Sequence, residues 1–264
     1  MNDIPVPVDQ LNAFAREAIE SAGAIAMRWF GKGRPGARFD KEMVTEVELQ
    51  LVNGFQELLR SRFPDHHYFD GNLAETGYTH DGGRYLWVFD PLDGVWNFAA
   101  GIPTWGMSVA LLENFWPILG VFHMPASGDW FHAVAGGKAY RGEKEIRISP
   151  QGDLTDESVL FIFSRFHNLY RAQFPGKIRN LGCTSAHICY VAEGRAEAAL
   201  IANESYKDLA AARVIIEAAG GRIFNLQGRP FQIGEYLEGP SDTSDLLVMS
   251  PHLFAQVSRC ISPV

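Results

Sequence analysis

The chain is poor in cysteine, in long apolar runs and in positive charge. It has three cysteines, Cys183, Cys189 and Cys260, and none forms a Cys-x-x-Cys pair. This argues against a disulfide framework or a zinc site and favours reduced thiols in a cytoplasm. No stretch reaches the roughly 18 apolar residues of a membrane span, and the N-terminus lacks the features of a signal peptide. The net charge of −8 disfavours nucleic acid or an anionic membrane as partner.

Sequence repeats, a P-loop and a dinucleotide fingerprint are absent as well, so no nucleotide cofactor is indicated. With 47% hydrophobic and 20% charged residues in 264, the chain can bury a large core. This length fits one domain or two closely packed halves. We expect an internal boundary near Pro150, with residues 1–150 carrying most acidic site residues and residues 151–264 contributing Asp208.

Hydrophobic periodicity predicts an α+β protein built as a layered sandwich. Helices are expected at residues 8–29, from Thr45 to the Phe63-Pro64-Asp65 break, and at 183–193, 208–219 and 251–260. Strands are expected at 66–69, up to Asp90, and at 106–112, 117–124, 130–134, 139–141, 159–163, 198–202, 222–224 and 246–249. Glu113-Asn114 and Gly136-Gly137 are expected as hairpin turns.

The most informative stretch is Trp87-Val88-Phe89-Asp90-Pro91-Leu92-Asp93-Gly94, where an apolar strand ends in two carboxylates. Burying two such like charges without a cation is costly, or forces one of them to take a proton. A hard divalent ion bound by oxygens solves this problem and indicates a Mg²⁺ site. A solvated Asp-Pro-x-Asp-Gly turn is the alternative, because Asp, Pro and Gly are common turn residues.

Three more acidic residues lie in distinct segments: Glu48, Glu75 and Asp208. With Asp90 and Asp93, their order along the chain resembles that of the inositol monophosphatase family. The segment 87–98 is similar to the signature W-x-x-D-P-[IL]-D-G-T-x-N-F. The segment 181–192 is similar to the family's L-G-S-A helix, and 208–221 to its W-D-x-A-A…E-A-G-G segment. These three ordered matches extend over most of the chain.

This resemblance implies an αβαβα sandwich and a Mg²⁺-dependent phosphatase, with Mn²⁺ as a possible substitute, that acts on a small phosphorylated substrate and forms a homodimer. It implies as metal ligands Asp90, Asp93, Asp208, Glu48 and the backbone carbonyl of Leu92. Catalysis would fall to Glu48, Asp90 and Asp93. Phosphate would rest on backbone N–H groups at Gly94 and Val95, since a helix start presents free donors. Other substrate contacts would come from Cys183, Thr184, Lys207 and Asp208.

Several positions depart from the family pattern near the nucleophilic water. Glu48 stands where the family has Asp, and Thr45-x-x-Glu48 could instead be a capping box. Asn72 replaces a metal-binding Glu, and it carries no charge. Glu75 or Asp70 could substitute for it, although a solvated loop is the alternative. Val95 replaces a Thr whose hydroxyl orients the attacking water.

The substrate side departs too. Ile201 replaces a Glu that contacts the polyol, Cys183 replaces a helix-start Ser, and Lys207 replaces a Trp. Lys207 could pair with an anionic substrate group or simply face solvent. Cys183 has no identifiable catalytic partner, so a nucleophilic role is disfavoured.

Other side chains are expected to have structural roles. We expect His66, His67 and His80 at the surface or partly buried. Five tryptophans are expected in the core or an interface: Trp87, Trp96, Trp105, Trp116 and Trp130. The apolar stretch Ala99–Met107 could supply the dimer contact.

Two functions follow. The first is a phosphomonoesterase for a small phosphorylated metabolite, such as an inositol, sugar or polyol phosphate. Related substrates of that chemistry are a nucleotide bisphosphate and an amino-alcohol phosphate. The second is a catalytically impaired relative that binds a ligand or a protein, because Asn72 and Val95 lack the groups that activate water.

Overall fold

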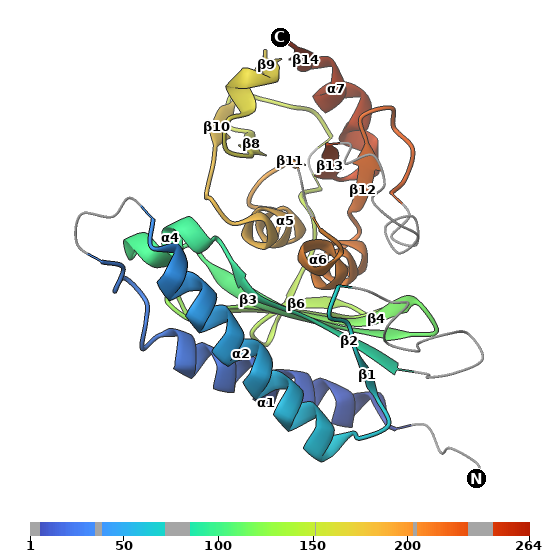
Figure 1. The fold of residues 1–264 in the computed structure, drawn as a ribbon. Helices are drawn as coiled ribbons and strands as arrows, with labels where there is room; N and C mark the ends of the chain where they lie inside the picture. Colours follow the sequence, from blue (N-terminus) through green and yellow to red (C-terminus); the bar gives the residue numbers. More distant parts are fainter. Residues whose placement is uncertain (1–5, 35–38, 72–84, 151, 203–204, 232–244) are drawn as a thin grey trace.

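The computed structural model describes residues 6–34, 39–71, 85–150, 152–202, 205–231 and 245–264. Two long helices, α1 (Val8–Ala26) and α2 (Lys41–Arg62), lie side by side over one face of the first sheet (Figure 1). Among these described residues, no helix is both long and apolar enough to cross a bilayer.

Helix α1 confirms the expected amphipathic segment, but α2 begins earlier than expected. Asp40 is its N-cap, and the Asp40 side chain accepts a hydrogen bond from the Met43 N–H at 3.2 Å. Such a cap satisfies one of the free N–H groups at a helix start. Thr45 therefore lies inside the helix, and the capping-box interpretation of Thr45 and Glu48 is wrong.

Among the described residues, the first sheet has seven strands in sequence order. They are β1 (His67–Tyr68), β2 (Tyr85–Asp93), β3 (Gly106–Glu113), β4 (Trp116–Met124), β5 (Asp129–Val134), β6 (Ala139–Arg141) and β7 (Lys144–Ile146). Only β1 and β2 pair in parallel; the other neighbours are antiparallel. The β3–β4 turn lies one residue later than expected, at Asn114 and Phe115, which both have positive φ as a tight hairpin requires.

In the part of the chain that the structure describes, the second sheet has five strands in the order β10-β8-β11-β13-β12. They are β8 (Val159–Ile162), β10 (Lys177–Arg179), β11 (Ala198–Ile201), β12 (Arg222–Asn225) and β13 (Leu246–Met249). Strands β9 (Tyr170–Ala172) and β14 (Ile261–Pro263) form a separate pair. Short helices complete this region: η1 (Phe166–Asn168), η3 (Pro251–Leu253) and α7 (Phe254–Arg259). The expected strands and helices of this half are confirmed, with ends displaced by one or two residues.

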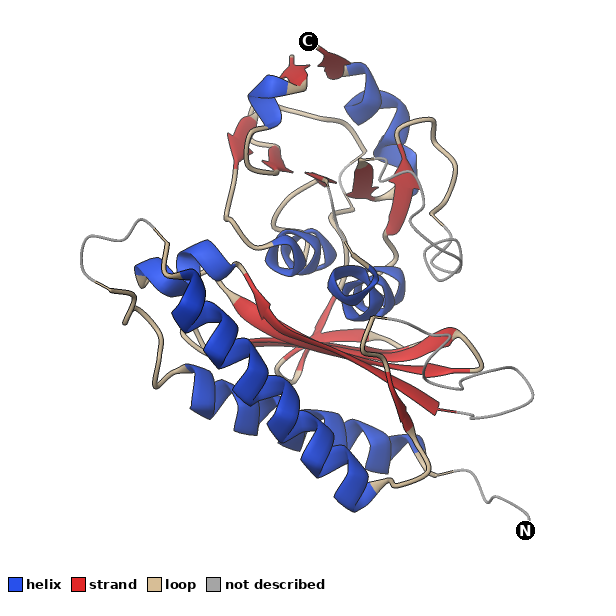
Figure 2. Ribbon diagram, viewed as in Figure 1, coloured by secondary structure: helices blue, strands red, loops and turns tan. Residues whose placement is uncertain are grey.

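Helices α5 (Thr184–Ala192) and α6 (Tyr206–Ala218) lie between the two sheets (Figure 2). One hydrophobic core fills the space between α1, α2 and the first sheet. A second core surrounds α5 and α6, and a third lies between the second sheet and α7. This alternation of helix and sheet layers confirms the αβαβα sandwich.

Helix α6 packs on the first sheet at unusually close range. A Cβ at Gly120, on β4, would lie 2.3 Å from the carbonyl oxygen of Ala211 on α6. Only glycine leaves room for a helix backbone this near a strand. The docking of α6 on the first sheet thus depends on the glycine at position 120 of β4.

We expect Gly120→Ala to lower the free energy of unfolding by about 1–3 kcal/mol or more, because the added methyl group overpacks this contact. Gly54→Ala is the control, since a Cβ at Gly54 meets nothing within 4 Å inside α2. Alanine there should raise stability by up to about 1 kcal/mol. Urea unfolding of both variants measures the difference, and equal behaviour would contradict the argument.

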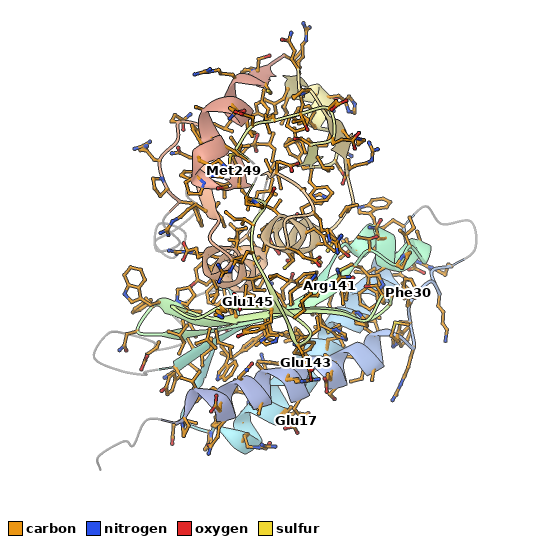
Figure 3. All side chains as sticks on the ribbon, turned by 180° about the vertical axis from the view of Figure 1, so that it is seen from behind. Glu17, Phe30, Arg141, Glu143, Glu145 and Met249 are labelled. Carbon is orange, nitrogen blue, oxygen red and sulfur yellow. The ribbon has the colours of Figure 1, made fainter. Side chains whose placement is uncertain are left out.

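An ion-pair cluster also joins the first sheet to α5. Arg141 of β6, labelled in Figure 3, donates to Glu193 at 2.8 Å and to Asp129 at 3.0 Å. The hydroxyl of Tyr190, on α5, donates to Asp129 at 2.9 Å. The first sheet comes from residues before 150 and the second from residues after it. These contacts join residues on the two sides of position 150. The division into residues 1–150 and 151–264 stays a prediction.

The aromatic and thiol side chains divide between core and surface. Trp87 and Trp105 are fully buried, whereas Trp96 and Trp116 are 59% and 65% exposed. All three cysteines are free thiols. Burial raises the pKa of Cys183 well above its usual value, and this agrees with the argument against a nucleophilic Cys183.

Candidate active site

Asp90 and Asp93 lie at the C-terminal end of β2, where the strand is irregular. Asp90 pairs with Ser108 and Asp93 with Gly106, so the register against β3 shifts between them. Residues three apart on a regular strand face opposite sides of the sheet. A bulge removes this alternation. The shift lets both carboxylates lie on one side of the sheet, and the charge of Asp93 contributes to the raised pKa of Asp90.

The carboxylate of Asp93 binds the start of α5. It accepts hydrogen bonds from the backbone N–H of Thr184 at 3.1 Å and from that of Ser185 at 2.6 Å. The first N–H groups of a helix lack partners within the helix, and the helix dipole favours an anion there. Asp93 therefore joins two segments that lie about ninety residues apart.

Asp90 is less well satisfied. It is 7% exposed, and one oxygen accepts a long bond of 3.4 Å from the N–H of Leu92. The other oxygen, Oδ2, is buried without a hydrogen-bond partner among the described residues. Burial, followed by the charges of Asp208 and Asp93, raises the pKa of Asp90 well above its usual value. Burial is also the main cause of the raised pKa of Asp93. Such an arrangement calls for a nearby positive charge.

Helix α6 brings Asp208 and Lys207 to the same place. Asp208 accepts from the N–H of Ser205 at 2.5 Å in a capping box. Lys207 is half-buried, so it does not simply face solvent. Its positive charge lowers the pKa of Asp90 and counteracts the rise that burial causes in the pKa of Glu48. Glu48 comes from α2, and three elements, β2, α2 and α6, thus supply charged groups here.

The donor chemistry fits a hard divalent cation, because the acidic groups offer only oxygens and Asp90 Oδ2 has no partner among the described residues. The arrangement is nevertheless incomplete: among the described residues, no three His, Cys, Asp or Glu side chains gather closely enough to hold a metal. Asn72 and Glu75 lie outside the described residues, and their roles stay predictions. Asp70 is exposed.

The expected phosphate-binding turn is locked between the two halves. Gly94 has a φ of +86°, and a Cβ there would lie 3.1 Å from the carbonyl oxygens of Gly182 and Thr104. It is the N-cap of the short helix α4 (Val95–Ala100). Asn97 donates through Nδ2 to the carbonyls of Thr104 at 2.6 Å and Leu181 at 2.7 Å. The turn is therefore fixed against the segment that leads into α5.

His187 holds this leading segment from the other side. Its Nε2 accepts the N–H of Leu181 at 2.9 Å, and its ring stacks on Phe161 at 5.0 Å between centroids. The side chain is 2% exposed, and burial lowers its pKa to about 4. Sequence reasoning missed both His187 and Asn97. The Asn of the W-x-x-D-P-[IL]-D-G-T-x-N-F signature falls on Asn97 and was the available signal for it.

The low pKa of His187 predicts a loss of stability in mild acid. An unfolded histidine takes a proton near pH 6.5, whereas folded His187 does so only near pH 4. Between these values the unfolded state binds more protons, so stability falls as the pH falls. The full difference is about 3 kcal/mol.

His187→Gln, which keeps an acceptor for Leu181 but does not titrate, should reduce this loss between pH 6.5 and 4. Chemical unfolding at several pH values measures it. His66 is a second histidine for comparison. Burial also lowers its pKa to about 4, and its Nδ1 accepts the Trp87 indole N–H at 2.9 Å. An unchanged pH slope in His187→Gln would contradict the assignment.

The sequence profile described as "Inositol monophosphatase family" matches residues 8–250. The chain belongs to the inositol monophosphatase family and is a phosphatase of that type.

Individual relatives agree with this assignment. A fructose-1,6-bisphosphatase/inositol-1-monophosphatase of Aquifex aeolicus is 26% identical over 92% of this chain and 96% of its own length. A histidinol-phosphatase of Chlorobaculum parvum is 29% identical over 81% of this chain and 85% of its own. The structure of a Thermotoga maritima IMPase has a TM-score of 0.77 at 23% identity, with 96% of both chains covered, and supports the fold.

Proposed function

We propose that the protein is a Mg²⁺-dependent phosphomonoesterase that hydrolyses a small phosphorylated metabolite of the sugar or polyol class. The observation that carries this proposal is the group of three interacting aspartates, Asp90, Asp93 and Asp208, with one buried oxygen of Asp90 unpartnered among the described residues. Such a group is stabilised by a cation, and the family supplies the reaction class.

In this proposal, Asp90, Asp93, Asp208, Glu48 and the Leu92 carbonyl hold Mg²⁺, for which Mn²⁺ can substitute. When bound, the ion polarises phosphoryl oxygens and lowers the pKa of a water molecule. The protein itself positions the remaining groups of the site. The contact of Asp93 with α5 holds the two halves of the chain together there.

The turn at Gly94 and Val95 offers backbone N–H groups to phosphate, and Cys183 and Thr184 lie across from it at the start of α5.

The substrate differs from a typical inositol phosphate at the polyol end. Ile201 replaces an acidic contact, and its apolar side chain offers no hydrogen bond to a hydroxyl group; it is also 1% exposed. An amino-alcohol phosphate is a reasonable member of the substrate class, since a relative bears the name histidinol-phosphatase. We further propose a cytoplasmic homodimer. Within Ala99–Met107, Ile102 is 48% exposed and available for a contact.

A panel of sugar, polyol, amino-alcohol and nucleotide phosphates tests the proposal with Mg²⁺ or Mn²⁺, by release of inorganic phosphate. We expect turnover of at least one compound, and its loss by about 10²-fold or more in Asp93→Asn, because a ligand charge is removed. Asp156→Asn, an exposed carboxylate, is the matched control. Thermal melting must show that Asp93→Asn is folded. Equal rates in the native protein and Asp93→Asn on every compound would reject the proposal.

A second function, ligand or protein binding with little hydrolysis, is favoured by Asn72 and Val95 together. If it holds, Asn72→Glu with Val95→Thr restores water activation and raises kcat by about 10²- to 10⁴-fold, the usual effect of general-base assistance. Phosphate release measures this gain. Adding Asp93→Asn to the double variant should abolish the gain. A native protein that is already fast would exclude this function.

A further inference from the structure

A pocket of about 570 Å³ lies beside the C-terminal half of α6, where this helix covers β4 (Figure 1). The start of β4, the turn between β5 and β6, the last two turns of α6 and the first residue of β12 line it. Asp208 stands near the beginning of α6, and Glu217 lines the pocket nine residues later. At about 1.5 Å per residue, the pocket is roughly 13 Å along the helix from the acidic site. Its size is typical of a small-molecule site.

Two arginine side chains of this pocket share one carboxylate oxygen. Arg213 donates to Glu217 Oε1 through Nε at 3.1 Å, and Arg222 donates to the same oxygen through Nη1 at 3.4 Å. A guanidinium group has more N–H donors than one oxygen can accept, so most of them remain available. Among the described residues, neither arginine has another hydrogen bond or ion pair. Two positive charges therefore meet one negative charge.

The burial of Arg213 makes this surplus of charge significant. Arg213 is only 9% exposed, although an arginine is almost never buried unless it is paired. Its partner Glu217 is shared with Arg222, and no other acidic residue lines the pocket within the described part of the chain. An anion from outside the chain would complete this pairing, because charge-assisted hydrogen bonds to guanidinium are strong.

A second cluster in the same protein shows a balanced arrangement. Glu193 also accepts hydrogen bonds from two arginines, Arg141 at 2.8 Å and Arg195 at 3.3 Å. There Asp129 adds a second carboxylate, which Arg141 contacts at 3.0 Å. Two positive charges thus meet two negative charges. The pocket beside α6 lacks this second carboxylate among the described residues, in a chain whose net charge is −8. Its local positive charge favours an anionic ligand.

An aromatic surface lies beside these charges. Trp116 lines the same pocket and is 65% exposed, whereas tryptophan is usually well buried. Phe115, at a φ of +69°, packs against the core around α5 and α6, and the side chain that follows it is left outside. A bulky residue rarely adopts this backbone conformation. An exposed indole offers a face on which a planar ring can stack.

We propose that this pocket binds a small organic anion that carries a planar ring. The anionic group contacts Arg213 and Arg222, and supplies the negative charge that Glu217 alone does not. The ring stacks on Trp116 at the edge of the pocket. Aromatic carboxylates and nucleoside monophosphates share this chemistry. The site is separate from the proposed phosphatase site, so binding there requires neither a metal ion nor hydrolysis.

Calorimetric titration of the whole protein in metal-free buffer tests the proposal. Two probes carry both a ring and a negative charge: indole-3-propionate with a carboxylate, and adenosine monophosphate with a phosphate. Two others, adenosine and inorganic phosphate, carry only one of these groups. We expect saturable binding of at least one complete probe, at least tenfold tighter than that of either partial probe, or ~1.4 kcal/mol. The complete probe that binds more tightly shows whether the pocket prefers carboxylate or phosphate.

Substitutions in the pocket locate the binding. Arg222→Met and Trp116→Leu should each weaken it at least tenfold, while Trp116→Phe, which keeps a ring, should weaken it less than Trp116→Leu. Arg195→Met is the matched control and should bind like the native protein. The Arg195 side chain is 62% exposed and pairs with Glu193 at 3.3 Å, whereas that of Arg222 is 55% exposed and pairs with Glu217 at 3.4 Å.

Thermal melting checks that each variant is folded, and Arg222→Gln replaces Arg222→Met if the latter is not. Absence of saturable binding of both complete probes at millimolar concentration would overturn the proposal. Binding that Arg222→Met and Trp116→Leu leave unchanged would overturn it too, because the probe would then occupy another place. Inorganic phosphate or adenosine that binds as tightly as the complete probes would also contradict it. A failed substrate panel counts only against the phosphatase proposal, since this binding involves no turnover.

Discussion

The structure depends on how it tolerates several carboxylates at the junction of its two halves. Two like charges a few ångström apart in a poorly solvated place repel strongly, and burial removes the water that would weaken this repulsion. The protein answers with three separate devices. The N–H groups of α5 bind Asp93, a capping box binds Asp208, and the Lys207 charge acts on Asp90 and Glu48. Asp90 Oδ2 keeps no partner among the described residues.

These devices also decide which elements must meet. The hydrogen bond from Thr184 N–H to Asp93 joins the end of β2 to the start of α5, and so joins the first sheet to the central helix layer. A second hydrogen bond, from Asn97 to the Leu181 carbonyl, makes a similar connection. Gly120 lets α6 lie close enough to β4 for its N-terminus to reach the same junction. The site is therefore fixed by backbone contacts on both sides. Among the described residues, the geometry of the site is set by packing between β2, α5 and α6.

Much of this architecture is predictable from the sequence, because it follows from local patterns. Periodicity located both long features of the C-terminal half, α5 and α6, and the strand that ends in Asp90. Local patterns failed where a side chain acts at a distance. Asp40 caps α2 because its carboxylate accepts hydrogen bonds from the backbone N–H groups of Arg34 and Met43. The Thr45-x-x-Glu48 pattern predicted a later start of this helix. The tight turn at Asn114 and Phe115 places an aromatic residue at positive φ, which turn propensities disfavour.

The candidate site shows the same limit more sharply. The resemblance named the acidic residues, but no local pattern pairs Asp93 with α5, because that contact joins positions about ninety residues apart. Lys207 was assigned to substrate or solvent, since sequence alone gives no neighbour for its ammonium group. In the folded chain, its charge lowers the pKa of Asp90 on β2 and opposes the rise in the pKa of Glu48 on α2.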